Sequence, residues 1–188
     1  HGLATSLAWN IRGDSAFYLD GQVFTAATAV QWLVDNDLLA SAEAIDSLPD
    51  ARGVMAAPGF AGYGAPLWKP HATASIAGLT LSHGKGEIAR AMVDGIAAQV
   101  ADLLGAIAAD GVAVKELRVD GGLTQSHTLM QMQADLAQVN IEVYPHPDAT
   151  AMGVANLAAM ATNSALNLGD FASAWKPVER YSPKWSTD

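Results

Sequence analysis

Residues 117–126 read LRVDGGLTQS, and this stretch contains the clearest structural pattern of the chain. The short apolar run Glu116–Val119 predicts a strand, which ends in Asp-Gly-Gly. Apolar residues then recur at three- and four-residue steps between Leu129 and Val139, and this spacing predicts a helix that begins directly after the glycines. The sequence therefore predicts a strand, a glycine turn and a helix in succession.

The glycine turn is a candidate binding site. Gly121 and Gly122 allow a positive φ and a close approach of a ligand to the backbone. The helix would point its free N–H groups and the positive end of its dipole into the same space, with Thr124 or Ser126 as N-cap. That arrangement suits an anion or the polar edge of a nucleotide. An ordinary βα turn without a ligand explains the spacing equally well, because one Gly-Gly pair is weak evidence.

Asp120 lies at the carboxyl end of the predicted strand, where ligands gather in open α/β sheets. It is the carboxylate in the best position for chemistry. A structural role, in which it anchors the turn by accepting bonds from backbone N–H groups, is the interpretation that we favour.

Composition and charge restrict the class of protein. The 188 residues are 51% hydrophobic and 15% charged, which predicts one globular domain over residues 1–188. A formal net charge of -9 argues against a nucleic-acid or anionic-membrane partner. The chain has no cysteine, so disulfides and thiolate metal sites are excluded. Its histidines are scattered without metal spacing, so no metal site is predicted. The sequence contains no run of about 18 apolar residues, so no membrane span is predicted. It shows no signal peptide, and this absence predicts a cytoplasmic location.

The remaining pattern predicts an α/β chain. Near the start, a hairpin over Thr5–Leu19 precedes a helix from Val23 to Val34, on which Ala27 and Gln31 face the same way. Gln31 is a polar group beside the apolar stripe, and solvent or a ligand fits it equally. The other predicted elements are a helical piece Ser41–Leu48, strands Gly53–Ala57 and Ser75–Leu79, the longest helix from Lys85 to near Gly111, a strand Asn140–Tyr144, a small-residue helix Ala149–Ala161 and a short helix Phe171–Trp175. The small-residue helix is predicted to pack closely on the long helix or on the sheet.

Several catalytic motifs are absent from the sequence. Gly84-Lys85 is followed by Gly86, so there is no Walker phosphate loop. Neither Gly-x-Ser-x-Gly nor a dinucleotide glycine fingerprint occurs at a strand–helix junction, which argues against a Rossmann-type dehydrogenase. The residues themselves suggest a nucleotide-binding half without a catalytic half.

Five stretches together resemble the C-terminal domain of the FGGY carbohydrate kinases, in the order of that family. They are Leu19–Phe24 with Gln31-Trp32-Leu33, Pro58–Trp68, Gly78-Leu79-Thr80, Val119–Gly122 with Leu129-Met130-Gln131, and Thr150–Gly153. The Gly-Ala-Pro-x-Trp form of the second stretch is most similar to the glycerol-kinase branch. The resemblance covers nearly the whole chain.

This resemblance implies an actin-like ATPase (ribonuclease H-like) domain, a mixed sheet with helices on both faces. It also implies ATP and Mg²⁺ as cofactors and a polyol or sugar as substrate. Gly122, together with Gly121, would lie against the adenosine part of ATP, and Gln31 would approach the nucleotide from its helix. Ala27 and Ser126 stand at two further nucleotide-binding positions, where the family has glycine and asparagine. Lys69 and Thr73 stand where it has aspartate and arginine, and these two changes bear on which substrate is used.

The resemblance further implies that the catalytic aspartate and the phosphate-gripping loop belong to an N-terminal kinase domain upstream of this chain. We therefore expect no catalytic residue here, an inactive isolated chain, and an exposed cleft face that favours self-association. The alternative is a nucleotide-binding or interaction module with a degenerate, non-catalytic site.

Overall fold

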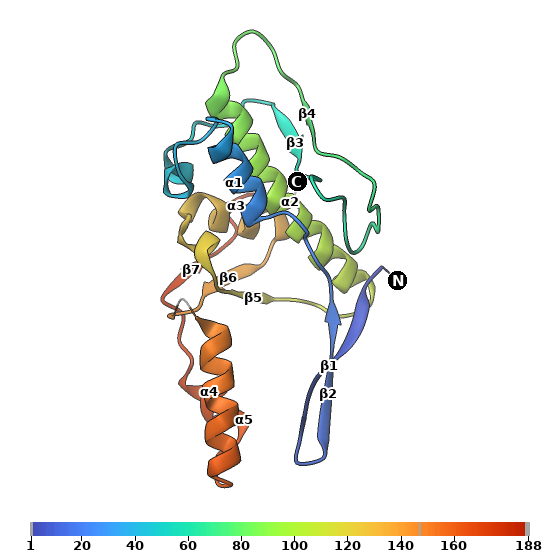
Figure 1. The fold of residues 1–188 in the computed structure, drawn as a ribbon, viewed down its shortest axis with the longest axis vertical. Coiled ribbons are helices and arrows are strands. Elements are labelled where there is room, and N and C mark those ends of the chain that lie inside the picture. Colours follow the sequence, from blue (N-terminus) through green and yellow to red (C-terminus); the bar gives the residue numbers. More distant parts are fainter. Residues whose placement is uncertain (1, 147, 187–188) are drawn as a thin grey trace.

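A computed structural model describes residues 2–146 and 148–186. The ends of the predicted domain, residues 1, 187 and 188, lie outside this description, as does residue 147. Figure 1 shows a packed upper body and two limbs that extend below it. One limb is the antiparallel hairpin of β1 (Ala4–Ile11) and β2 (Asp14–Asp20), and the other contains α4 (Ala149–Thr162) and α5 (Leu168–Ala174).

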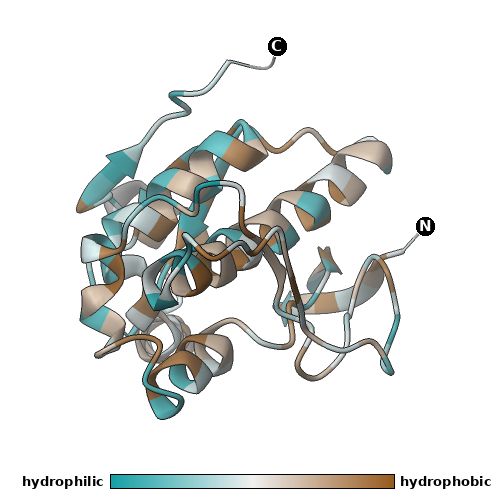
Figure 2. Ribbon diagram, turned by 90° about the horizontal axis from the view of Figure 1, so that it is seen from above, coloured by the Kyte–Doolittle hydropathy of each residue, from teal (hydrophilic) through white to brown (hydrophobic). Residues whose placement is uncertain are grey.

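The long helix α2 (Lys85–Ala109) is the spine of the body. It packs on α3 (His127–Ala137), on α1 (Ala27–Asp35) and on the strand β3 (Met55–Ala57). The approach to β3 is close because α2 carries Gly95 there: a Cβ at this position would lie 2.3 Å from the carbonyl oxygen of Ala56. The largest buried side chains of α2, α3 and the strand β6 (Asn140–Val143) meet in one core, among them Met92, Ile96, Leu129, Met130 and Ile141. Figure 2 shows hydrophobic and hydrophilic residues alternating along these helices, as expected for helices with one face in a core.

The α/β class is confirmed, but the single mixed sheet is divided into three small sheets. The three-stranded sheet is mixed: β5 (Glu116–Val119) runs parallel to β6 (Asn140–Val143), and β6 runs antiparallel to β7 (Glu179–Tyr181). β3 pairs only with β4 (Ser75–Ala77), and the β1–β2 hairpin forms the third sheet. The predicted hairpin is confirmed. The sequence also predicted the strands β3, β4, β5 and β6 without showing which of them pair, and it did not predict β7.

Three helical segments differ from their predicted form or starting residue. The piece after Ser41 is a 3-10 helix, η1 (Ala42–Ser47), whose Ile45 is buried in the core. The segment after the glycines is another 3-10 helix, η2 (Gly122–Gln125), so α3 begins at His127 rather than directly after the turn. The helix predicted from Val23 begins at Ala27.

The Gly- and Pro-rich loop over residues 58–70 is held against the body by side-chain contacts. The hydroxyl of Thr25, just before α1, donates to the carbonyl oxygen of Pro58. The rings of Phe60 and Trp32 lie 4.8 Å apart between centroids. Nε1 of Trp68 donates to the carbonyl oxygen of Gly2 at 2.6 Å. The loop is therefore fixed to α1 and to the start of the chain.

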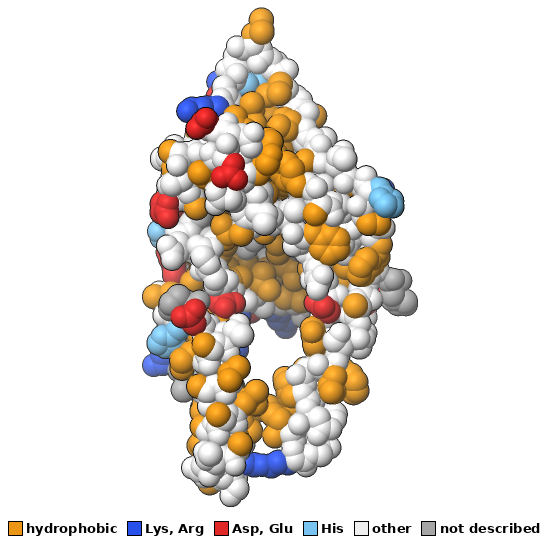
Figure 3. All heavy atoms as spheres, in the orientation of Figure 1, with side chains coloured by type: hydrophobic (Ala, Val, Ile, Leu, Met, Phe, Trp, Pro, Cys, Tyr) orange, Lys and Arg blue, Asp and Glu red, His pale blue; other side chains and the backbone are white. Residues whose placement is uncertain are grey.

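The prediction that the small-residue helix packs closely on the long helix or the sheet is wrong. Among the described side chains of α4, only Met160 is buried, while Val154 and Leu157 are 64% and 48% exposed. Figure 3 shows an opening between the two limbs, with hydrophobic side chains on both sides of it. Arg12 crosses this opening and donates to the carbonyl oxygen of Met160 at 3.2 Å.

One described helix, α2, is long and apolar enough to cross a membrane when judged by length and composition alone. The sequence predicted no such span. Because α2 packs on α1, α3 and β3, its apolar face is part of the core of this fold.

Candidate functional site

A cavity of about 720 Å³ lies where the glycine turn faces α1 and η1. One wall comes from α1 through Ala27 and Gln31, a second from Ser41–Glu43, and a third from Asp120–Leu123 with Gln125. Its volume is within the range of small-molecule sites, about 300–1,000 Å³. Segments far apart in the sequence thus enclose one space.

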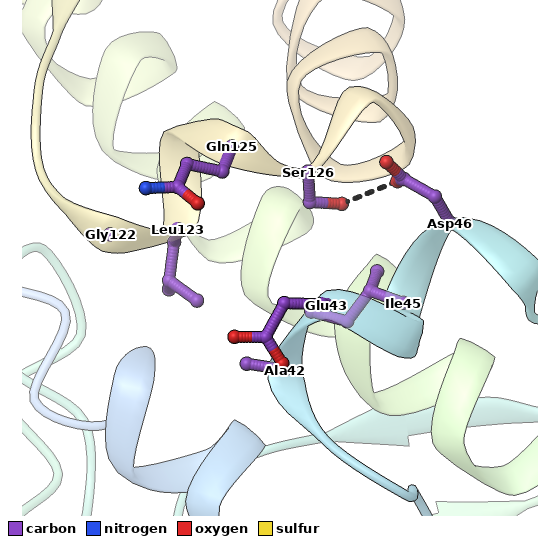
Figure 4. Close-up of a pocket in the computed structure, with 8 residues that line it drawn as sticks. All are labelled: Ala42, Glu43, Ile45, Asp46, Gly122, Leu123, Gln125 and Ser126. Atoms are coloured by element: carbon purple, nitrogen blue, oxygen red, sulfur yellow. Dashed lines mark hydrogen bonds between the residues drawn. The ribbon is translucent and has the colours of Figure 1, made fainter.

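Four of the five predicted nucleotide-binding residues line this cavity: Ala27, Gln31, Gly121 and Gly122. Gln31 is exposed, and its amide nitrogen donates to Asp35 at 2.8 Å within α1. The fifth, Ser126, is buried and lines a smaller adjoining cavity of about 120 Å³. Figure 4 shows this smaller cavity, with Leu123 and Gln125 of η2 facing Ala42 and Glu43 of η1.

The two glycines of the turn contribute differently. Gly121 has a φ of 99°, a conformation that favours glycine, and it leads the chain from β5 into η2. Gly122 has no such φ, and a Cβ on it would meet nothing within 4 Å. The N–H groups of Gly122 and Leu123 bond to no other described residue. Backbone donors and open space therefore meet at Gly122.

The first turn of α3 does not offer free N–H groups to a ligand, which corrects the prediction. Ser126, one of the two predicted N-cap candidates, is the N-cap, and its Oγ accepts from the N–H of Leu129 at 3.2 Å. The carboxylate of Asp46 accepts from the N–H groups of His127 and Thr128, at 3.1 and 2.8 Å. A carboxylate of the protein thus occupies the place that the sequence left for an anion.

The wall of the larger cavity is acidic and polar. Glu43 and Asp120 contribute carboxylates, Gln31 and Gln125 contribute amides, and the described lining includes no lysine, arginine or histidine. A hydrogen bond from the side chain of Ser41, followed by the backbone N–H of Glu43 itself, lowers the pKa of Glu43. Because Glu43 is ionised at neutral pH, this wall suits an uncharged ligand surface with N–H donors and disfavours phosphate.

Asp120 does not anchor the turn as predicted. It is exposed at the edge of the cavity, and its carboxylate accepts no hydrogen bond from the described residues. The bond within the turn comes from Thr124, whose hydroxyl donates to the carbonyl oxygen of Gly121 at 2.7 Å. Asp120 therefore contributes an exposed carboxylate to the lining of the cavity.

The sequence did not reveal Glu43, Gln125 or Asp46 as part of the site. Gln125 lies three residues beyond Gly122 and could have been found from the turn itself. Glu43 and Asp46 lie about 80 residues earlier, in a segment whose short helical pattern gave no sign of its partner. Within the described part of the chain, no group of three His, Asp or Glu side chains could hold a metal ion.

Comparisons with known proteins agree on one family. The model of the C-terminal domain of the FGGY family of carbohydrate kinases matches residues 1–162. A glycerol kinase from Aromatoleum aromaticum is 38% identical over 99% of this chain and 39% of its own length. A glycerol kinase from Alkalilimnicola ehrlichii is 43% identical over 98% of this chain and 38% of its own length. The chain thus spans about two fifths of the relatives that it matches.

Solved structures give the same result for the fold. The structure of Plasmodium falciparum glycerol kinase with ADP superimposes with a TM-score of 0.88 at 30% identity, over 98% of this chain and 38% of that one. The predicted fold class, an actin-like ATPase (ribonuclease H-like) domain, is confirmed.

Proposed function

The chain belongs to the FGGY family of carbohydrate kinases, and we propose that it is the C-terminal, ATP-binding half of a kinase that phosphorylates a hydroxyl of glycerol or of a related polyol or sugar. The observation that carries the proposal is the cavity of about 720 Å³ between the glycine turn, α1 and η1. A glycerol kinase of very similar fold has been solved with ADP, which supports a nucleotide as the ligand of this domain.

In this proposal the cavity holds the adenosine part of the nucleotide. Gly122 lets the ligand approach the backbone, since no side chain stands there, and Gln31 borders it from α1. The N–H groups of Gly122 and Leu123 are available as donors. The phosphates project away from the acidic wall at Glu43 and Asp120, because negative charges on the phosphates and on the carboxylates repel each other.

Phosphoryl transfer depends on positioning both reactants and on neutralising charge. The residues of this chain position the nucleotide, and we propose that an N-terminal domain of the parent protein supplies the catalytic base and the acceptor site. Mg²⁺ would neutralise charge on the phosphates. Because the described residues form no metal cluster of their own, the ion is proposed to arrive with the nucleotide. The proposed location is the cytoplasm.

The substitutions at Ala27 and Ser126 bear on affinity. Ala27 adds a methyl group to the α1 wall where the family has glycine. The hydroxyl of Ser126 is used inside the protein, because it donates to Asp46 at 2.8 Å. We therefore propose that Gly122 and the amides of Gln31 and Gln125, rather than Ser126, contact the nucleotide.

The test is a calorimetric titration of the chain with Mg-ADP and Mg-ATP, repeated on Gly122→Leu. A Cβ at position 122 meets nothing within 4 Å, so we expect the fold to tolerate leucine, whose side chain would occupy the ligand's place. We expect binding by the wild-type chain and at least about tenfold weaker binding by Gly122→Leu, the factor that about 1.4 kcal/mol supplies.

Gly153→Leu is the matched control, because Gly153 in α4 also has nothing within 4 Å of a Cβ and lies outside the cavity. It should bind ADP as the wild-type chain does. Equal affinities in all three proteins would place the nucleotide elsewhere, and no binding by the wild-type chain at millimolar ADP would leave the degenerate module as the better explanation.

A further inference from the structure

Asp46 joins two walls of the cavity that the chain builds about 80 residues apart. Its Oδ1 accepts from the hydroxyl of Ser126 and from the N–H of Thr128, both at 2.8 Å. Its Oδ2 accepts from the N–H of His127 at 3.1 Å. Figure 4 shows Asp46 beside Ser126, with Glu43 and Gln125 on the two sides of the adjoining space.

We propose that Asp46 is a positioning residue of the nucleotide cavity: its carboxylate holds η1 on the N-terminal end of α3 and so fixes the distance between Glu43 and Gln125. The proposal rests on the proposed function and adds a residue that no ligand touches. In this role Asp46 determines the width and the stiffness of the cavity and does not contact the nucleotide.

The chemistry of the contact supports a firm connection. A carboxylate offers only acceptors, and three donors converge on it, so charge assists each bond. The positive end of the α3 dipole adds to the attraction. Burial opposes the charge of Asp46, yet the bonds from Thr128, Ser126 and His127 outweigh it and hold its pKa below the usual value. The carboxylate is therefore ionised at neutral pH.

The other residues of η1 show how much of its attachment to the body depends on Asp46. Ile45 is only 1% exposed and packs in the core, so η1 stays near α3 without Asp46. The hydroxyl of Ser47 donates to the carbonyl oxygen of Ala44, within η1 itself. Among the described hydrogen bonds, those of Asp46 alone join a side chain of η1 to η2 or α3. Losing them should therefore change the geometry of the cavity more than the stability of the fold.

The occupied helix end has a second consequence. All three of the first N–H groups of α3 are bonded by Asp46 and Ser126. A phosphate of the nucleotide cannot use this helix end while Asp46 is in place. Removal of the carboxylate should open it to a small anion, since free N–H groups at a helix N-terminus attract one.

The variants Asp46→Ala and Asp46→Asn separate this role from a general loss of structure. Alanine removes all three bonds. Asparagine keeps an oxygen for Ser126 and Thr128 but turns a donor toward the N–H of His127, so it loses one bond. Asp50→Ala is the control, because among the described hydrogen bonds Asp50 accepts from the N–H of Arg52, and it is not among the residues that line either cavity.

Calorimetry with Mg-ADP should show affinities weakened by about tenfold in Asp46→Ala, by less in Asp46→Asn, and not at all in Asp50→Ala. Inorganic phosphate should bind Asp46→Ala more tightly than the wild-type chain. Partial recovery by asparagine would not follow from a mere packing role. ADP affinity unchanged in Asp46→Ala, with faster amide exchange at His127 and Thr128, would overturn the proposal and leave Asp46 a simple helix cap.

A readout without nucleotide separates this proposal from the proposed function. The chain has no cysteine, so nitroxide labels at Ala42→Cys and Gln125→Cys report the distance between η1 and η2 by electron paramagnetic resonance. The distance distribution should be broader or longer when Asp46→Ala is added. A wild-type chain that does not bind ADP would refute the proposed function, while an unchanged label distance would refute the positioning role by itself.

Discussion

The helices α2 and α4 are both rich in alanine and both contain glycine, but they have opposite surroundings. In α2 eight residues are buried, and the helix forms the spine of the body. In α4 one described residue is buried, and the helix stands in a limb. Small apolar residues therefore predict a helix without predicting what it packs on. The partner is decided by chain segments that are distant in sequence.

The largest expected difference between the two helices comes from the same substitution in each. Leu104 of α2 is 8% exposed and belongs to the core, whereas Leu157 of α4 is 48% exposed. We expect Leu104→Ala to lower the free energy of unfolding by about 2–5 kcal/mol, because it leaves a cavity. Leu157→Ala should cost less than about 1 kcal/mol. Urea unfolding measures both, and equal losses would mean that α4 is buried in solution.

Glycine provides the second comparison. At Gly95 of α2 a Cβ would lie 2.3 Å from the carbonyl oxygen of Ala56 and 2.8 Å from Cδ of Pro58, so Gly95→Ala should destabilise the fold by about 1–3 kcal/mol. At Gly153 of α4 a Cβ meets nothing, so Gly153→Ala should stabilise the helix by up to about 1 kcal/mol. Thermal unfolding shows the sign of each change. A destabilising Gly153→Ala would reveal a close neighbour of α4.

These contrasts also show what the sequence could predict. The long helix and the strand before Asp120 were predicted correctly, and the N-cap was narrowed to Thr124 or Ser126, because each depends on neighbouring residues. The division into three sheets and the exposure of α4 were not predicted, because pairing and packing depend on segments far apart.

The candidate site divides in the same way. The glycine turn, Gln31 and Ala27 were found from local patterns and a family resemblance, and they line one cavity. The sequence did not reveal that the carboxylate of Asp46 occupies the N-terminal end of α3, because Asp46 lies 82 residues before its partner Thr128. A free helix N-terminus in a sequence pattern is therefore only a candidate until the whole fold shows whether a side chain fills it.

The smallest expected effect concerns association of the exposed limbs. Leu7, Trp9 and Phe17 of the hairpin are 54%, 41% and 69% exposed, and Val154 of α4 is 64% exposed. Apolar side chains that gather on both sides of an opening favour contact with a second copy, so we expect weak, concentration-dependent association in sedimentation equilibrium. Val154→Ser should weaken it by about fivefold, which is about 1 kcal/mol of lost apolar burial.

Val178→Ser is the control for this last prediction, because Val178 is exposed to nearly the same extent, 68%, but lies outside the two limbs. If both valines change the association equally, general hydrophobicity rather than the limbs drives it. A strictly monomeric wild-type chain at high concentration would show that the exposed face of α4 differs from the α2 face in a further respect: its apolar residues are too few or too dispersed to hold a partner.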